Sequence, residues 1–179
     1  LRLNAAVFSS DYEDMQIAVL DGGFFNITNA GNSTIQGFEL ELTALPTPNL
    51  DINVGLGYLD AEYDSVTASA IQADVFESNE LPMVPELTFN AGVGYTWPME
   101  EMGSISARLD YAYEDERYSY ANNAPGNLLD SYSVFNLRVD WRSADEQWKA
   151  SLIGLNVADE EYLLFAEDVR QTASPLGTI

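Results

Sequence analysis

The sequence contains neither cysteine nor histidine. Without cysteine the chain cannot form disulfides or thiolate metal sites, and without histidine it lacks the side chain that most often transfers protons near neutral pH. No nucleophile stands beside a general base, and no glycine-rich phosphate-binding loop is present. We therefore expect no enzyme activity, no catalytic residue, no metal site and no cofactor.

Positive charge is also scarce. The chain has 7 lysine and arginine residues against 29 aspartate and glutamate residues, which gives a net charge of -22, and Lys149 is its single lysine. Phosphate backbones repel a chain this acidic, so we expect no nucleic-acid partner. The near absence of lysine is also unusual for soluble β-sheets, which commonly protect their exposed surfaces and edges with lysine.

Long apolar runs are absent as well. No stretch approaches the roughly 18 consecutive apolar residues of a membrane helix. The first residues lack the basic segment and apolar run of a signal peptide, so a retained signal peptide is not expected. A membrane role therefore requires a β-barrel.

Strict alternation of apolar and polar residues dominates what is present. Apolar residues occupy every second position from 38 to 44 and again from 50 to 58, and the proline-rich segment 45–49 separates the two runs. A period of two is that of a strand with one apolar face, and proline lacks the amide donor that a ladder needs. The segment therefore predicts a hairpin of two long strands.

The same pattern recurs along the chain and predicts about seven strands. They are expected at residues 1–12, 24–44, 50–58, 87–97, 104–114, 134–142 and 148–163. We expect a register change near 9–11, a turn at 21–23 and an interruption of the second strand at 29–33. Short turns at 45–49, 98–103 and 143–147 alternate with long loops at 64–86, which includes a short helix within 68–75, and at 115–130. Such alternation indicates an up-and-down sheet with its short turns at one end.

The orientation of the apolar face separates the possible barrels. A soluble ligand-binding β-barrel would enclose this face, whereas an outer-membrane barrel turns it toward lipid. Tyrosine and tryptophan gather near the strand ends, as in interfacial girdles, and the apolar strips carry no charge until their ends. An open seven-stranded sheet would leave two unpaired edges in hydrocarbon. The fold class is therefore all-β, an antiparallel up-and-down transmembrane β-barrel segment of a larger barrel; a smaller outer-membrane barrel with a structural or adhesive role is the other alternative.

Four segments carry a family resemblance: residues 28–42 (TNAGNSTIQGFELEL), 50–63 (LDINVGLGYLDAEY), 81–97 (LPMVPELTFNAGVGYTW) and 154–165 (GLNVADEEYLLF). In order and spacing they resemble the C-terminal barrel half of TonB-dependent outer-membrane receptors, and the likeness covers nearly the whole chain.

The resemblance implies a barrel of about 22 strands in the bacterial outer membrane, in contact with lipid and closed by the receptor's own plug domain. It also implies import of a scarce ligand, most often a ferric siderophore, with energy that the TonB complex transmits through the plug. Residues 1–179 contain neither a plug domain nor the final strand of such barrels. We therefore expect a C-terminal barrel segment that cannot transport alone.

Candidate plug-facing residues occupy the polar positions of the alternating strands. The resemblance implies that Glu39 and Glu41 meet arginines of the plug, and the alternative is that both are solvated lumen carboxylates. Arg108 and Arg138 share this parity with Asp110 and Asp140, which predicts a charge ladder across neighbouring strands. The alternative for these four residues is wall electrostatics without a plug contact.

Candidate ligand contacts lie in the long loops, because loops vary while strands fix the scaffold. Tyr118, Tyr120, Asn122 and Asn123 give the loop 115–130 an aromatic and amide character suited to a planar chelate or a sugar. Such residues are also ordinary loop material. Three further carboxylates, Asp74, Glu77 and Glu80, are of the type that binds a hard cation such as calcium. Their spacing matches no compact metal loop, so we expect them to be solvated.

Overall fold

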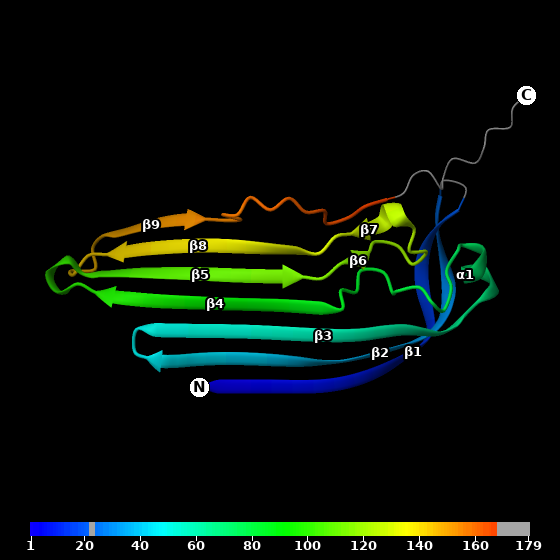
Figure 1. The fold of residues 1–179 in the computed structure, drawn as a ribbon, viewed down its shortest axis with the longest axis horizontal. Coiled ribbons are helices and arrows are strands. Elements are labelled where there is room, and N and C mark those ends of the chain that lie inside the picture. The colour runs from blue at the N-terminus through cyan, green and yellow to red at the C-terminus, as the bar shows by residue number, and fades with distance from the viewer. Residues whose placement is uncertain (22–23, 168–179) are drawn as a thin grey trace, which may run out of the picture.

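The computed structural model describes residues 1–21 and 24–167 (Figure 1). The main sheet contains seven antiparallel strands in the order β1-β2-β3-β4-β5-β8-β9. Their bounds are β1 Arg2–Asp21, β2 Phe24–Thr47, β3 Leu50–Val66, β4 Leu87–Pro98, β5 Ser104–Glu114, β8 Tyr132–Arg142 and β9 Lys149–Gly154. The predicted up-and-down sheet is confirmed.

Minor elements occupy the connections. The long connections contain helix α1 (Ala68–Gln72), helix η2 (Pro125–Asn127) and a small sheet of β6 (Arg117–Tyr118) and β7 (Leu128–Leu129), and the β4–β5 turn contains helix η1 (Glu100–Met102). The helix expected within 68–75 is thus present. The three short turns lie at one end of the sheet and the long connections at the other (Figure 1). None of the helices in the described ranges has the length and hydropathy needed to cross a membrane.

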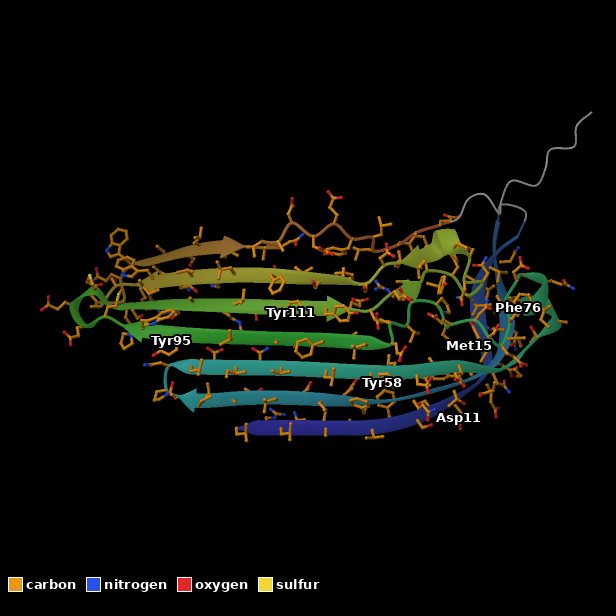
Figure 2. All side chains as sticks on the ribbon, viewed as in Figure 1. Asp11, Met15, Tyr58, Phe76, Tyr95 and Tyr111 are labelled. Atoms are coloured by element: carbon orange, nitrogen blue, oxygen red, sulfur yellow. The ribbon has the colours of Figure 1, made fainter. Side chains whose placement is uncertain are left out.

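The apolar face of the sheet is not enclosed. Val93, Leu109 and Leu137 lie directly opposite one another on β4, β5 and β8, and they are 43%, 41% and 38% exposed. Tyr58, Tyr95 and Tyr111 lie on the same face of β3, β4 and β5 as this row (Figure 2). A soluble barrel would pack this row into a closed core. Among the described residues no such core encloses the row.

The first two strands are longer than the pattern predicted. β1 continues to Asp21, and β2 begins at Phe24 as predicted and extends to Thr47, with register shifts in its ladders inside the segment 29–33 where an interruption was predicted. The register change lies at 12–16 rather than at 9–11, because Met15 pairs with Gly31 in a bulge. Gly31 has φ +126°, which favours glycine, and a Cβ there would overlap the carbonyl of Ser65. The turn expected at 21–23 includes residues outside the described range.

Two strand ends also differ from the prediction. β3 continues to Val66 and pairs with β2 alone beyond Tyr58, since β4 begins at Leu87 opposite Tyr58. Beyond this point apolar and polar residues still alternate as far as Asp64, but Leu59, Ala61 and Tyr63 now place the apolar side chains on the face that carries Asp51. β9 ends at Gly154 rather than near residue 163, because the left-handed Asn156 (φ 48°) turns the chain and its side chain binds the backbone of Glu160.

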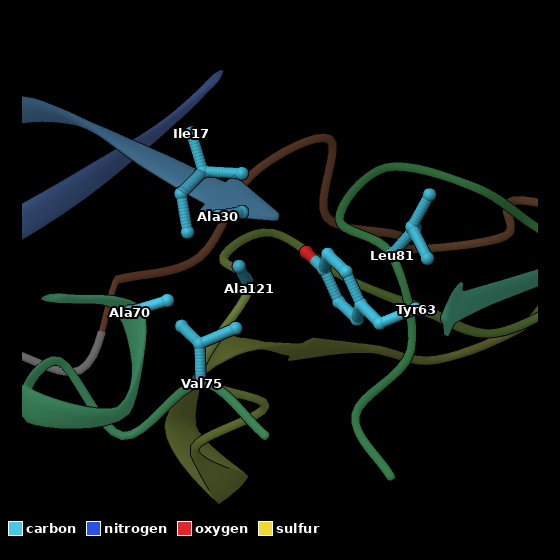
Figure 3. Packing of buried hydrophobic residues seen from close by; sticks show 7 residues of the cluster. All are labelled: Ile17, Ala30, Tyr63, Ala70, Val75, Leu81 and Ala121. Atoms are coloured by element: carbon cyan, nitrogen blue, oxygen red, sulfur yellow. The ribbon is translucent and has the colours of Figure 1, made fainter. Parts of the chain in front are cut away.

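The buried apolar cluster of the described residues lies at the long-loop end. It contains Ile17, Ala30, Tyr63, Ala70, Val75, Leu81 and Ala121 (Figure 3). Tyr63 lies on the same face of β3 as Asp51, because the two positions differ by an even number along an unbroken strand. The cluster therefore lies on the polar side of the sheet.

Candidate functional site

An arginine-centred network lies on the polar face across three strands. Asp51, Gly94 and Arg108 are direct neighbours in register on β3, β4 and β5. Arg108 Nη1 donates to Asp51 Oδ1 at 2.7 Å, and Arg108 Nη2 donates to Asp110 Oδ1 at 2.7 Å. Nη2 also donates to Asn53 Oδ1. The guanidinium thus spans β4 and joins strands that do not pair with each other.

Glycine at two positions of β4 makes this span possible. A Cβ at Gly94 would overlap the carboxylate of Asp51, and a Cβ at Gly92 would overlap the guanidinium of Arg108. Both glycines belong to the polar parity that the sequence shows. Asp51 also occupies a polar position of its strand, and this signal could have marked it as a residue of the polar face. Its contact with Arg108 was not predictable, because 57 positions separate the two residues in the sequence.

Arg138 forms a second ion-pair group. Its Nε donates to Asp140 Oδ2 at 2.6 Å, and Asp140 Oδ1 accepts from Ser151 Oγ at 2.5 Å and lies 3.6 Å from Lys149 Nζ. Arg108 and Arg138 lie directly opposite each other. The predicted ladder therefore differs in detail: each arginine pairs with the aspartate two positions along its own strand, and the bonds to other strands go to β3 and β9.

Glu39 and Glu41 on β2 each pair with a glycine of β3. They are opposite Gly57 and Gly55, and both side chains are exposed on the polar face. Asn4 Nδ2 donates to Glu41 Oε2 at 3.0 Å. Within the described ranges no cation forms an ion pair with either glutamate.

The candidate ligand-binding residues separate into different environments. Asn123 adopts φ 48°, its Oδ1 accepts from Glu80 N at 2.6 Å, and its Nδ2 donates to Glu80 O at 3.1 Å. The carbonyl of Tyr118 accepts from Met83 N at 2.7 Å. Tyr118 and Asn123 therefore contribute to the contact between the two long connections.

Tyr120 and Asn122 instead meet at a cavity of about 240 Å³. Its other walls come from β1, from the end of α1 and the turn after it, from the second long connection and from the segment after β9: Ala18, Val19, Gln72, Ala73, Asp74, Val75, Ala121, Asn127 and Glu167. The ring of Tyr120 packs edge-on against Phe165, with 5.4 Å between centroids. Asn122 Oδ1 accepts from Asn127 Nδ2 at 2.9 Å. The lining combines an aromatic ring and amides with small apolar side chains and the carboxylates of Asp74 and Glu167, and an aromatic wall beside polar groups suits a small planar group.

A second cavity of about 490 Å³ is strongly acidic. Its carboxylates are Asp60, Glu62, Glu77, Glu80, Glu86, Asp115 and Glu116. Partial burial and then repulsion by Glu116, Glu86 and Asp115 raise the pKa of Glu80. Asp74 lines the other cavity, so the three carboxylates singled out in the sequence do not converge. In the part of the chain that the structure describes, no group of acidic side chains has the geometry of a metal site.

A comparison with protein families matches residues 1–157 to the family described as TonB dependent receptor-like, beta-barrel. The chain belongs to this family. TonB-dependent receptors are β-barrel proteins of the bacterial outer membrane and are not enzymes, which confirms the predicted family, location and lack of enzyme activity.

Individual TonB-dependent receptors resemble the chain over a limited part of their length. A probable TonB-dependent siderophore receptor, PiuA of Acinetobacter baumannii, is 26% identical over 121 residues, which cover 64% of this chain and 16% of that protein. The crystal structure of the ferric yersiniabactin uptake receptor FyuA from Yersinia pestis matches 89% of this chain and 23% of its own with a TM-score of 0.71 and 21% identity. The crystal structure of PiuA from Acinetobacter baumannii matches with a TM-score of 0.68 and 21% identity, over 89% of this chain and 22% of that chain. The chain thus spans less than a quarter of these relatives.

Proposed function

We propose that the chain forms the C-terminal wall segment of an outer-membrane receptor that imports a ferric siderophore with TonB-coupled energy. The observation that carries this proposal is the match of residues 1–157 to the receptor barrel family. Two relatives support the choice of ligand class, since one is named a probable TonB-dependent siderophore receptor and the other a ferric yersiniabactin uptake receptor.

The two faces of the sheet have different proposed partners. The exposed row of Val93, Leu109 and Leu137 contacts lipid, since hydrocarbon is the medium in which exposed apolar side chains cost nothing. The polar face lines the lumen and contacts the receptor's own plug domain, through which the TonB complex acts. A barrel of about 22 strands would surround that plug.

The four candidate plug contacts are not equivalent. Arg108 is occupied by Asp51, Asn53 and Asp110 and serves mainly to join the wall. Arg138, at 45% side-chain exposure, and the two glutamates 39 and 41 are open to a partner. Cationic plug side chains placed near the glutamates would compensate carboxylates that otherwise face the lumen without an ion-pair partner in the described chain.

Ligand contact is proposed for the cavity that Tyr120 and Asn122 line. A volume of about 240 Å³ accommodates one planar arm of a chelate rather than the whole complex. Tyr118 and Asn123 would act indirectly, by holding the connections that form the cavity wall.

Iron uptake in a strain that lacks the receptor gene tests the proposal. Restoring the full-length gene should restore growth on at least one of a panel of ferric siderophores supplied as the only iron source. Removal of the TonB complex should abolish that growth again. Equal growth with and without the gene on every siderophore, combined with normal insertion in the outer membrane, would contradict the import function and favour a structural or adhesive barrel.

A further inference from the structure

Two carboxylates line the cavity that Tyr120 and Asn122 share, those of Asp74 and Glu167. Asp74 follows helix α1 in the first long connection (residues 67–86), and Glu167 lies in the segment after β9. No cation of the described ranges forms an ion pair with either carboxylate. The cavity of about 240 Å³ therefore carries negative charge that the described part of the chain does not neutralise.

The backbone that carries the Asp74 carboxylate is anchored on both sides. Asp74 N donates to Ile71 O at 3.1 Å, and Asp74 O accepts from Asn79 Nδ2 at 3.2 Å. The next residue, Val75, belongs to the buried cluster (Figure 3). This side of the cavity is therefore held in place by the core of the long-loop end.

Contacts with the second long connection (residues 115–131) hold Glu167. The ring of Phe165 packs edge-on against Tyr120, and Ala166 N donates to Ser119 Oγ at 3.2 Å. Burial and then the negative charge of Glu167 raise the pKa of the Tyr120 hydroxyl, which agrees with a carboxylate close to the ring. Both carboxylates thus reach the cavity from anchored segments, which reduces the ordering cost of binding a ligand there.

The lining combines the groups that recognise a planar organic cation. Tyr120 provides an aromatic ring, whose face attracts a positive charge. Asp74 and Glu167 provide acceptors for charge-assisted hydrogen bonds. A metal ion fits less well, because in the described ranges no group of three acidic side chains has the geometry of a metal site.

The surroundings of the cavity disfavour an anion. The neighbouring cavity of about 490 Å³, which the first long connection also lines, contains the seven carboxylates named above. In the two long connections the single cation is Arg117, which is 5% exposed and forms an ion pair with Glu114. An anionic group that enters here meets no available cation in the described chain, whereas a cationic group is attracted by every carboxylate.

We propose that the cavity binds a planar, positively charged group of the imported ligand, such as an amidinium or a guanidinium. Asp74 and Glu167 compensate the charge of this group, and the Tyr120 ring lies beside its plane. The inference rests on the import function proposed above and adds the charge of the ligand to it. It favours chelates with a cationic arm over chelates whose arms are neutral or anionic.

Binding of three small probes to the purified full-length receptor, without siderophore, tests the charge preference. Benzamidinium, benzamide and benzoate share a planar ring and are positive, neutral and negative at neutral pH. In ligand-detected NMR titrations benzamidinium should bind at least about tenfold more tightly than benzamide, and benzoate should bind most weakly. Equal binding of benzamidinium and benzamide, tighter binding of benzoate, or no binding of benzamidinium up to about 10 mM would overturn the proposal.

Single substitutions assign the preference to this cavity. Asp74→Asn and Glu167→Gln should each weaken benzamidinium binding by about 3- to 10-fold and leave benzamide binding unchanged. Asparagine tolerates the left-handed backbone at position 74 (φ 59°), so this exchange removes charge without strain. Glu77→Gln is the matched control, because it removes a carboxylate from the other cavity, and it should change binding by less than about twofold. An equal loss in Glu77→Gln would show only a general attraction by the acidic surface and would overturn the assignment.

The probes contain no iron, so their binding is measured independently of import. Absence of a charge preference, together with growth of the complemented strain on a ferric siderophore, would overturn this inference and leave the import function standing. A charge preference in a receptor that supports growth on none of the ferric siderophores would overturn the import function instead, and the cavity would retain its preference for an organic cation.

Discussion

Arg108 on β5 contacts Asp51 on β3 across the whole width of β4, with 2.7 Å between Nη1 and Oδ1. The contact exists because Gly94 lies between the two residues in register and has no side chain. On the polar face, glycine therefore provides space for a charged side chain to join strands that are not neighbours.

Gly94→Val should destabilise the barrel by about 1–3 kcal/mol, because the added side chain overlaps the Asp51 carboxylate and displaces the ion pair. Urea unfolding of the full-length receptor, followed by tryptophan fluorescence, measures the change. Ala91→Val is the control, since it adds a similar volume on the opposite face of the same strand. Equal midpoints for the two variants would contradict the proposed role of the glycine.

Loss of the cation should matter more than loss of one carboxylate. Asp51→Asn should cost at most about 1 kcal/mol, because both partners are partly exposed and Asp110 still pairs with Arg108. Arg108→Met should cost about 1–2 kcal/mol, because it leaves Asp51 and Asp110 without a cation. The same unfolding assay ranks the two variants. A larger loss for Asp51→Asn would show that the arginine does not join the strands.

Acidification should tighten the packing around Glu80. Partial burial and the neighbouring carboxylates of Glu116, Glu86 and Asp115 raise the pKa of Glu80, so the folded state binds its proton more readily than the unfolded state does. The stability of the loop should therefore increase as the pH falls from neutral through this raised pKa. Protease cleavage within residues 76–83 should become slower over that range. Glu80→Gln should flatten the pH dependence, whereas Glu101→Gln, in the β4–β5 turn, should leave it intact.

The ligand cavity predicts a difference between two tyrosines of the same loop. Tyr120→Ala should weaken siderophore binding by roughly 3- to 10-fold through loss of an aromatic wall, provided that the cavity receives the ligand. Tyr118→Ala should have a smaller effect, because its contact with Met83 is made by the backbone carbonyl, which the substitution retains. Equilibrium titration of the purified receptor with the siderophore identified by growth measures both. Equal effects would remove the cavity from the binding site.

Sequence predicted the central strands well, because a sheet with one apolar and one polar face imposes a period of two on their residues. β4, β5 and β8 accordingly begin and end within about two residues of their predicted bounds. Beyond Tyr58 the apolar residues pass to the opposite face, with Leu59, Ala61 and Tyr63, so the pattern no longer continues that of the predicted strand although the strand runs to Val66. β1 was likewise predicted to end too early, at residue 12 rather than Asp21, whereas β2 begins at Phe24 as predicted.

The site was only partly accessible from sequence. Tyr120 and Asn122 were correctly placed in a long loop, and the structure adds that they share a cavity. Asn123 was selected for the same reason, the aromatic and amide residues of this loop. Its pairing with Glu80, 43 positions away, depends on the fold of both connections and could not be predicted. Asp51 was missed because its partner is two strands distant. Residue type and parity are visible in a sequence, whereas contacts across an intervening glycine are not.

The orientation of the two faces is tested most directly by spin labels at single cysteines in the full-length receptor in a bilayer, since this chain contributes no cysteine of its own. Labels replacing Val93, Leu109 and Leu137 should be accessible to oxygen, which concentrates in lipid, and shielded from a water-soluble nickel chelate. Labels at Asn90 and Ser106, on the polar parity, should show the reverse. Greater exposure of the apolar row to the water-soluble reagent would contradict a lipid-facing wall and the receptor function built on it.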